Sequence, residues 1–214
     1  MLDWEKKKLS NCGSIYNGGT PNTQNKEYWN GDVLWCTPTD ITNNKGKYIN
    51  FTDRKITTKA IKHVGKLLPP GTILLCSRAT IGELAISSNQ ITTNQGFKNI
   101  VVNDENDNEF IYYLLQTKKK EMIEKATGST FFEISKKEIE NLEINIPQKK
   151  EQIIISKCLS EIDLLIENIK SLIKKKKFIK QGVMQELLTG KKRLSGFNGK
   201  WIKKELQELG DFTS

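Results

Sequence analysis

One stretch of the chain limits its possible folds more than any other. From Lys149 to Leu188 there is no proline and one glycine. Apolar residues recur there at alternating spacings of four and three, at Ile155, Leu159, Ile162, Ile166, Ile169 and Ile173, and the pattern resumes after residues 174–177 at Ile179, Val183 and Leu187. This spacing predicts a long helix with a heptad stripe.

Such a helix would be roughly 57 Å long at 1.5 Å per residue. A small domain cannot cover a narrow apolar stripe over that length, so we expect another helix alongside. The alternative is a surface helix folded back on its own domain.

Composition places the chain among globular proteins. Hydrophobic residues make up 36% of its 214 residues and charged residues 28%, which is enough to build a core. The chain has neither an apolar run long enough to span a membrane nor an apolar segment after its first charges, so we expect a cytoplasmic protein. The spacing of the four cysteines and the single His63 predicts neither a zinc site nor a disulfide framework.

The positive charge is unevenly distributed. The net charge is +9, which points to an anionic partner. Residues 45–98 hold nine bases against Asp53 and Glu83, whereas residues 99–147 hold six bases against ten acids. We call residues 45–98 the basic island. The alternative is that the lysines are solvated surface residues without a partner.

The chain reads as three parts, with boundaries at residues 1–147, 148–190 and 191–214. Turn signals punctuate the first part. Short apolar runs there predict strands at Val33–Trp35, Gly71–Cys76, Ile81–Ile86 and Ile100–Val102, and a 3.6-residue period predicts a helix at Glu109–Glu124. We therefore expect an α+β domain, a mixed α/β globular fold, followed by a long helix that forms a coiled coil.

The third part contains a repeat of the sequence near the start of the chain. Residues 4–13 read WEKKKLSNCG, and residues 201–210 read WIKKELQELG. Repetition at a fixed period marks an architecture of repeated units, so residues 191–214 are predicted to be a linker and the truncated start of a second unit. Chance similarity in a lysine-rich chain is the alternative.

Eight segments occur in an order that resembles the specificity subunit of type I restriction-modification systems. They are Gly18–Pro21 (GGTP), Tyr28–Trp35 (YWNGDVLW), Thr39–Ile41 (TDI), Leu74–Gly82 (LLCSRATIG), Asn94–Phe97 (NQGF), Gly128–Phe131 (GSTF), Ile146–Gln152 (IPQKKEQ) and Gln185–Gly190 (QELLTG). Each is weak alone; together they cover nearly the whole chain.

The resemblance implies a target-recognition domain that reads one half of a split DNA sequence, followed by a helical spacer. Full-length members of that family look like two such units in one chain, with the two spacer helices packed antiparallel. This chain therefore resembles half of a specificity subunit. A single unit leaves its stripe uncovered, and a two-fold dimer is the closed arrangement that covers it. We therefore expect an antiparallel homodimer; a helix from a methyltransferase partner is the alternative cover.

Candidate DNA contacts fall in the basic island. Lysines suit phosphates, which give affinity without sequence information, and we select Lys45, Lys47, Lys55 and Lys98. Base edges suit forked donors, which gives Arg54, Arg78, Asn94 and Gln95, with Thr80 adding a hydroxyl. Arg78, Asn94 and Gln95 lie in segments that carry the resemblance, which favours a structural role for them and leaves Arg54 as the main reader. Tyr28, Trp29, Trp35 and Phe97 are expected in the core.

Enzymatic alternatives find little support. The only Glu-x-Lys, Glu5 to Lys7, has no acidic strand before it as a metal-dependent nuclease needs, and Pro69-Pro70 follows leucine rather than the Asn or Asp of an adenine methyltransferase. No catalytic residue, metal or cofactor is expected, and the resemblance assigns modification and cleavage to partner methyltransferase and restriction subunits. A structural coiled-coil protein that binds nucleic acid nonspecifically through its lysines remains the alternative.

Overall fold

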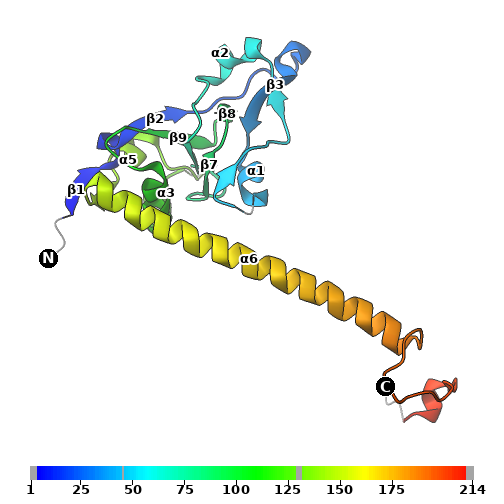
Figure 1. The fold of residues 1–214 in the computed structure, drawn as a ribbon. Coiled ribbons are helices and arrows are strands. Elements are labelled where there is room, and N and C mark those ends of the chain that lie inside the picture. Colours follow the sequence, from blue (N-terminus) through cyan, green and yellow to red (C-terminus); the bar gives the residue numbers. More distant parts are fainter. Residues whose placement is uncertain (1–3, 45, 129–131, 211–214) are drawn as a thin grey trace. The chain divides into compact units, whose positions relative to one another are not determined.

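The chain divides into two compact units, Met1–Leu159 and Ser160–Ser214. The structure, a computed structural model, describes residues 4–44, 46–128 and 132–210 (Figure 1). It bears out the α+β class of the globular part and the long helix that follows it.

Three small sheets organise the first unit. The largest has the strand order β2-β9-β6-β7-β4, the second β5-β3-β8 and the third β1-β10. The strands are β1 (Glu5–Lys8), β2 (Gly13–Asn17), β3 (Trp29–Cys36), β4 (Tyr48–Ile49), β5 (Lys55–Ile56), β6 (Ile73–Cys76), β7 (Leu84–Ser87), β8 (Ile91–Thr93), β9 (Phe97–Val102) and β10 (Glu143–Ile146).

Most neighbouring strands run antiparallel. The two parallel pairs, β4 with β7 and β3 with β8, each join a strand that precedes β6 in the chain to one that follows it. Because such parallel pairs join distant segments, they are not visible as local patterns in the sequence.

The predicted strands correspond to β3, β6, β7 and β9. The β7 strand starts at Leu84 rather than Ile81, since Gly82 has a positive φ of 85° and turns the chain just before it. The predicted helix at Glu109–Glu124 is two helices, α3 (Asn108–Thr117) and α4 (Lys119–Glu124). They separate at Lys118, whose main-chain N–H donates to the Leu115 oxygen at 3.1 Å. This bond spans three residues, as in a 3-10 helix, and not four as in an α-helix.

The remaining helices of this unit are short: η1 (Leu9–Asn11), η2 (Lys26–Tyr28), α1 (Pro38–Asn43), η3 (Thr58–Ala60), α2 (Ile61–Val64) and α5 (Lys136–Glu140). Three apolar clusters form the core. The largest joins β2, β6, β7 and β9 to α3 through residues such as Ile73, Ile100 and Leu115, all fully buried. A second lies around Phe97, and the third consists of Trp29, Trp35, Ile56, Ala60 and Val64.

The long helix α6 (Lys149–Leu188) has 40 residues. In its first turns, Ile155 packs against the largest cluster, and the buried Gln152 side chain donates to Asn106 and Pro147 and accepts from the Asp107 N–H at 2.9 Å. Ile155 is therefore not part of the exposed stripe that was predicted, because it packs against the core of its own domain.

Further along α6 the stripe is uncovered. Leu159 and Leu187 are partly exposed, and the residues between them on the stripe are 43–56% exposed: Ile162, Ile166, Ile169, Ile173, Ile179 and Val183. Among the described residues, no helix is both long and apolar enough to cross a membrane.

The second unit contains most of α6 and the segment after it, including η4 (Leu206–Glu208). In that segment the Arg193 guanidinium lies over the Trp201 ring at 5.5 Å, yet Trp201 remains 57% exposed. Several other apolar side chains are also exposed there, among them Phe197, Ile202, Leu206 and Leu209.

Candidate nucleic-acid interface

The exposed side chain of Arg54 lies on a pair of buried tryptophans. Its guanidinium carbon is 3.7 Å from the centroid of the Trp29 ring and 5.2 Å from that of Trp35. The two indoles meet edge to face at 5.1 Å and donate to the main-chain oxygens of Asn22 and Gly19. Since both indoles are fixed, they hold the planar guanidinium in place by a cation–π contact.

The backbone that carries Arg54 is fixed as well. The main-chain oxygen of Arg54 accepts from the Thr52 hydroxyl at 2.7 Å and from the main-chain N–H of Trp35 at 3.3 Å. Asp40, 7% exposed, accepts from both donor groups of Thr37 at 2.7 Å, as in a capping box, and its other oxygen accepts from the Asp53 N–H at 2.9 Å. Asp40 thus ties the start of α1 to the loop before Arg54.

The guanidinium itself is available to a ligand. Within residues 4–44, 46–128 and 132–210, no protein group makes a hydrogen bond or an ion pair with it. A guanidinium held over an aromatic ring, with its N–H donors unused by the described residues, can donate to the two acceptors of a guanine edge.

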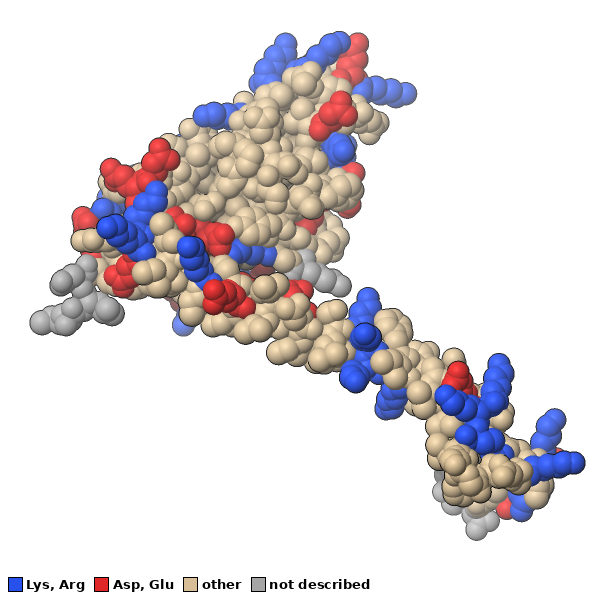
Figure 2. Space-filling view, in the orientation of Figure 1, with Lys and Arg blue, Asp and Glu red and all other residues tan. Residues whose placement is uncertain are grey.

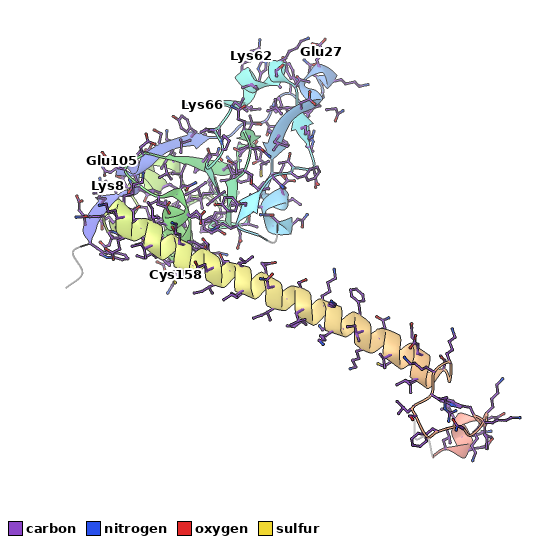
Figure 3. The ribbon with its side chains drawn as sticks, viewed as in Figure 1. Lys8, Glu27, Lys62, Lys66, Glu105 and Cys158 are labelled. Atoms are coloured by element: carbon purple, nitrogen blue, oxygen red, sulfur yellow. The ribbon has the colours of Figure 1, made fainter. Side chains whose placement is uncertain are left out.

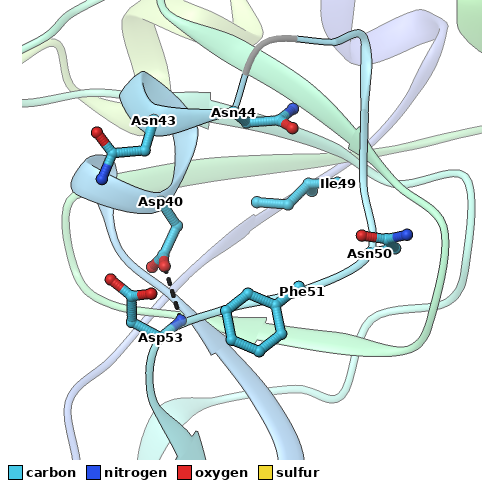
Figure 4. Close-up of a pocket in the computed structure, with 7 residues that line it drawn as sticks. All are labelled: Asp40, Asn43, Asn44, Ile49, Asn50, Phe51 and Asp53. Atoms are coloured by element: carbon cyan, nitrogen blue, oxygen red, sulfur yellow. Dashed lines mark hydrogen bonds between the residues drawn. The ribbon is translucent and has the colours of Figure 1, made fainter.

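A hollow of about 200 Å³ opens beside this loop (Figure 4). Asp40, Asn43, Asn44, Ile49, Asn50, Phe51 and Asp53 line it. Asn44 is occupied, since it donates to the main-chain oxygens of Gly46 and Tyr48. In the described part of the chain, the amides of Asn43 and Asn50 have no hydrogen bond, and the Phe51 ring is 61% exposed. The hollow therefore combines two side-chain amides, which can both donate and accept hydrogen bonds, with an exposed aromatic ring.

Exposed lysines follow Arg54 along the chain. Ile56, Ala60 and Val64 recur at intervals of four and turn inward onto the tryptophans. This spacing leaves Lys59, Lys62 and Lys66 exposed, with Lys55 partly exposed. We call Arg54, Lys55, Lys59, Lys62 and Lys66 the basic segment. Figure 2 shows blue side chains gathered around α2, and Figure 3 shows Lys62 and Lys66 projecting outward.

The partners of these lysines leave them accessible. Lys59 pairs with Glu27 at 3.5 Å, but both side chains are about 70% exposed, and such a pair contributes little. Lys66 lies over the Tyr16 ring at 4.5 Å and donates to its hydroxyl, which lowers the pKa of Tyr16. Lys59, Lys62 and Lys66 were not among the predicted DNA contacts, although the interval of four between the buried residues signals their exposure.

Two of the selected phosphate contacts are engaged inside the domain. The Lys98 ammonium, 7% exposed, bonds the Glu133 carboxylate at 2.8 Å. Lys47, 10% exposed, pairs with Glu109 and donates to the Tyr113 hydroxyl. These internal ion pairs argue against the predicted phosphate contacts. Lys45 lies outside the described residues.

Arg78 shares Glu133 with Lys98. Its Nε donates to the second carboxylate oxygen at 2.7 Å. Burial raises the pKa of Glu133, but the hydrogen bonds from Lys98 and Arg78 outweigh it and leave that pKa below its ordinary value. Arg78 therefore joins β6 to the segment around Glu133.

The other selected residues lie in two turns. The Asn94 side chain accepts from the Gly96 N–H at 2.9 Å and so holds its own turn. Gln95 is exposed and contacts the Thr20 hydroxyl. Thr80 lines a separate hollow with Ile123 and Phe132. The structure does not bring these residues together with Arg54 in one contact set.

The expected core aromatics are buried. Trp29, Trp35 and Phe97 are at most 8% exposed, whereas Tyr28 is partly buried. Among the described residues there is no cluster of His, Cys, Asp and Glu that could hold a metal ion.

Comparison with known proteins identifies the family. Residues 1–177 match the family described as type I restriction modification DNA specificity domain. The MjaIX type I restriction enzyme specificity subunit of Methanocaldococcus jannaschii is 45% identical over 171 residues, 78% of this chain and 40% of the relative. The Escherichia coli EcoR124I/EcoR124II specificity subunit is 27% identical over 78% of this chain and 42% of the relative.

Solved structures share the fold. The HsdS subunit of Thermoanaerobacter tengcongensis superposes with a TM-score of 0.64 at 18% identity, over 86% of this chain and 44% of that one. A type I restriction-modification S subunit from M. genitalium gives a TM-score of 0.56 at 21% identity, over 86% and 46%. The chain thus spans about two-fifths of the length of the curated relatives that it matches. It belongs to the family of type I restriction modification DNA specificity domains.

Proposed function

We propose that this chain reads one half of a split duplex DNA sequence as the specificity subunit of a type I restriction-modification complex. The observation that carries the proposal is the Arg54 guanidinium, stacked on Trp29 with its donors unused and followed by four exposed or partly exposed lysines. The two curated relatives named above, both type I restriction enzyme specificity subunits, support the same function.

Within this proposal the residues have separate roles. Arg54 reads a guanine edge, while Lys55, Lys59, Lys62 and Lys66 bind phosphates. The hollow beside Arg54 adds Asn43, Asn50 and Phe51 as further contacts for base edges or the thymine methyl group. Arg78, Asn94 and Gln95 hold loops together. The chain needs no cofactor and is not catalytic; methylation and cleavage belong to partner methyltransferase and restriction subunits.

The long helix sets the distance between two such domains. Six stripe residues from Ile162 to Val183 are about half exposed. Burying an apolar stripe of this kind is favourable at about 25 cal/mol per Å² of apolar surface. We propose that two chains pair antiparallel through it, with residues 1–147 as the recognition domain, 148–190 as the spacer and 191–214 as a linker and the start of a second unit.

A nonspecific lysine-driven binder is the second candidate. Lys174–Lys177 are exposed on α6 and favour it. Competition separates the two: a labelled duplex that carries the preferred site is bound, then challenged with excess random duplex. A sequence reader keeps its site and shows a specificity ratio of about 10³ or more. Equal displacement by random DNA at every salt concentration would instead establish the nonspecific binder.

A further inference from the structure

Residues 4–13, the first copy of the repeated sequence, are docked on their own domain. Strand β1 pairs antiparallel with β10, and Leu9 and Cys12 are fully buried. The Trp4 indole meets Phe110 edge to face at 6.1 Å and donates to Glu151 at 3.3 Å. We call β10, Phe110 and Glu151 the docking surface; Figure 1 shows β1 beside the first turns of α6.

Residues 201–210, the second copy, form the same short 3-10 turn at the same positions, although residues 202–205 are not in a strand as β1 is. Helix η4 starts at Leu206, the counterpart of Leu9, and both helices close with a 2.9 Å bond, Cys12 N–H to Leu9 oxygen and Leu209 N–H to Leu206 oxygen. The closing residues also match, with φ and ψ of −98° and −7° at Cys12 and −103° and −11° at Leu209. The turn of the second copy therefore has the same backbone conformation as the turn of the docked copy.

Its apolar side chains, however, are uncovered. The counterparts of Trp4, Leu9 and Cys12 are Trp201, Leu206 and Leu209, which are 57%, 70% and 66% exposed. Lys6, which is exposed and pairs with Glu143, has Lys203 as its counterpart. Each position that is buried in the docked copy is thus apolar in the second copy, and a lysine is kept where the docked copy meets Glu143.

We infer that residues 201–210 are a second docking strand, which binds the docking surface of another copy of this chain in exchange for that copy's own residues 4–13. Two residues separate the end of β10 from the start of α6, and the second strand follows the end of α6. In an antiparallel pair, the end of one helix lies beside the start of the other, so each second strand reaches the partner's docking surface. This step rests on the antiparallel dimer proposed above. Strand addition to β10 supplies main-chain bonds, and exchange of identical elements makes such dimers accessible.

Disulfide trapping tests the exchange directly. In full-length protein with Cys158→Ser, the pair Lys6→Cys and Asn145→Cys joins residues that are register partners in β1 and β10, and an intrachain disulfide is expected. The matched pair Lys203→Cys and Asn145→Cys should give a disulfide-linked dimer. Leu9→Ala weakens the resident strand by about 30-fold or more and should increase this dimer, whereas Leu206→Ala should suppress it.

A second measurement does not need the disulfide. Leu206→Ala alone should leave the urea midpoint unchanged, and Leu9→Ala should lower it only in part, because the second strand replaces the first. The double variant should lower the urea midpoint by clearly more than the two single variants do when their decreases are added.

Three outcomes would overturn the inference. In the first, the Lys6/Asn145 cysteine pair forms its disulfide while the Lys203/Asn145 pair gives no dimer even with Leu9→Ala. In the others, the Lys203/Asn145 disulfide forms within one chain, or the effects of Leu9→Ala and Leu206→Ala on the urea midpoint are additive. Sedimentation of the same samples separates this failure from failure of the proposed function. A dimer without exchange removes only the inference, whereas a monomer at micromolar concentration removes the antiparallel pair itself.

Discussion

The Arg54 guanidinium lies over the Trp29 ring, with its central carbon 3.7 Å from the ring centroid. Trp29 is 8% exposed and its indole N–H is bonded to a main-chain oxygen, so the ring is a fixed support. A side chain that is ordered before binding loses less conformational entropy when it binds. The stack therefore favours a geometric role for Arg54 rather than a purely electrostatic one.

Replacing Arg54 by lysine keeps the charge and removes the fork. We expect Arg54→Lys and Arg54→Ala each to relax the preference at one base pair by about 1–3 kcal/mol. Competition binding with single-base-pair variants of the site measures this. Arg193→Lys is the matched control, because Arg193 also lies over a tryptophan but outside the first unit. Equal weakening on all sequences would reassign Arg54 to phosphate.

Removing lysines from the basic segment should change affinity without changing preference. Each of Lys59→Gln, Lys62→Gln and Lys66→Gln should reduce the slope of log K against log salt by about 0.9. Lys120→Gln is the control, since Lys120 is 91% exposed in the acid-rich part of the chain. If the three variants behave like the control, the basic segment does not face DNA.

Glu133 should support the domain against acid. Its folded-state pKa is lowered, so its contribution to stability is present above the unfolded pKa of about 4.3 and is lost as the pH falls through the folded value. Glu133→Gln leaves the Lys98 charge buried without its partner, which should destabilise the fold by about 3 kcal/mol at pH 7.

Urea unfolding of this variant at pH 7 and below pH 4 measures both effects, and the difference from wild type should shrink at the lower pH. Glu143→Gln, in an exposed pair with Lys6, is the control and should change little. A constant difference at all pH values would show that the carboxylate charge has no part in stability.

A charge on the helix stripe should separate the chains. Ile166→Asp places a carboxylate in the middle of the proposed contact, where burial without a partner is strongly unfavourable. Sedimentation should show a dimer for wild type and a monomer for the variant. Ser171→Asp introduces the same charge on a different face of α6 and should remain a dimer. If both variants stay dimeric, another surface holds the chains together.

Local patterns predicted the long helix and several strands, because the spacing of Ile162, Ile166 and Ile169 is itself the signal. The break at Lys118 was not predictable, since the apolar period continues through it. For contacts, Lys98 and Lys62 look alike in the sequence. Their difference comes from Glu133, 35 residues after Lys98, which the fold brings to its ammonium at 2.8 Å. Long-range pairing of charges therefore limited the choice of site residues.

Selection of bound duplexes from a random pool tests the central claim most directly. An antiparallel pair of identical readers predicts two short blocks of defined sequence, each the inverted repeat of the other, separated by a spacer of fixed length and random sequence. A single asymmetric block, or no enriched sequence at all, would contradict it.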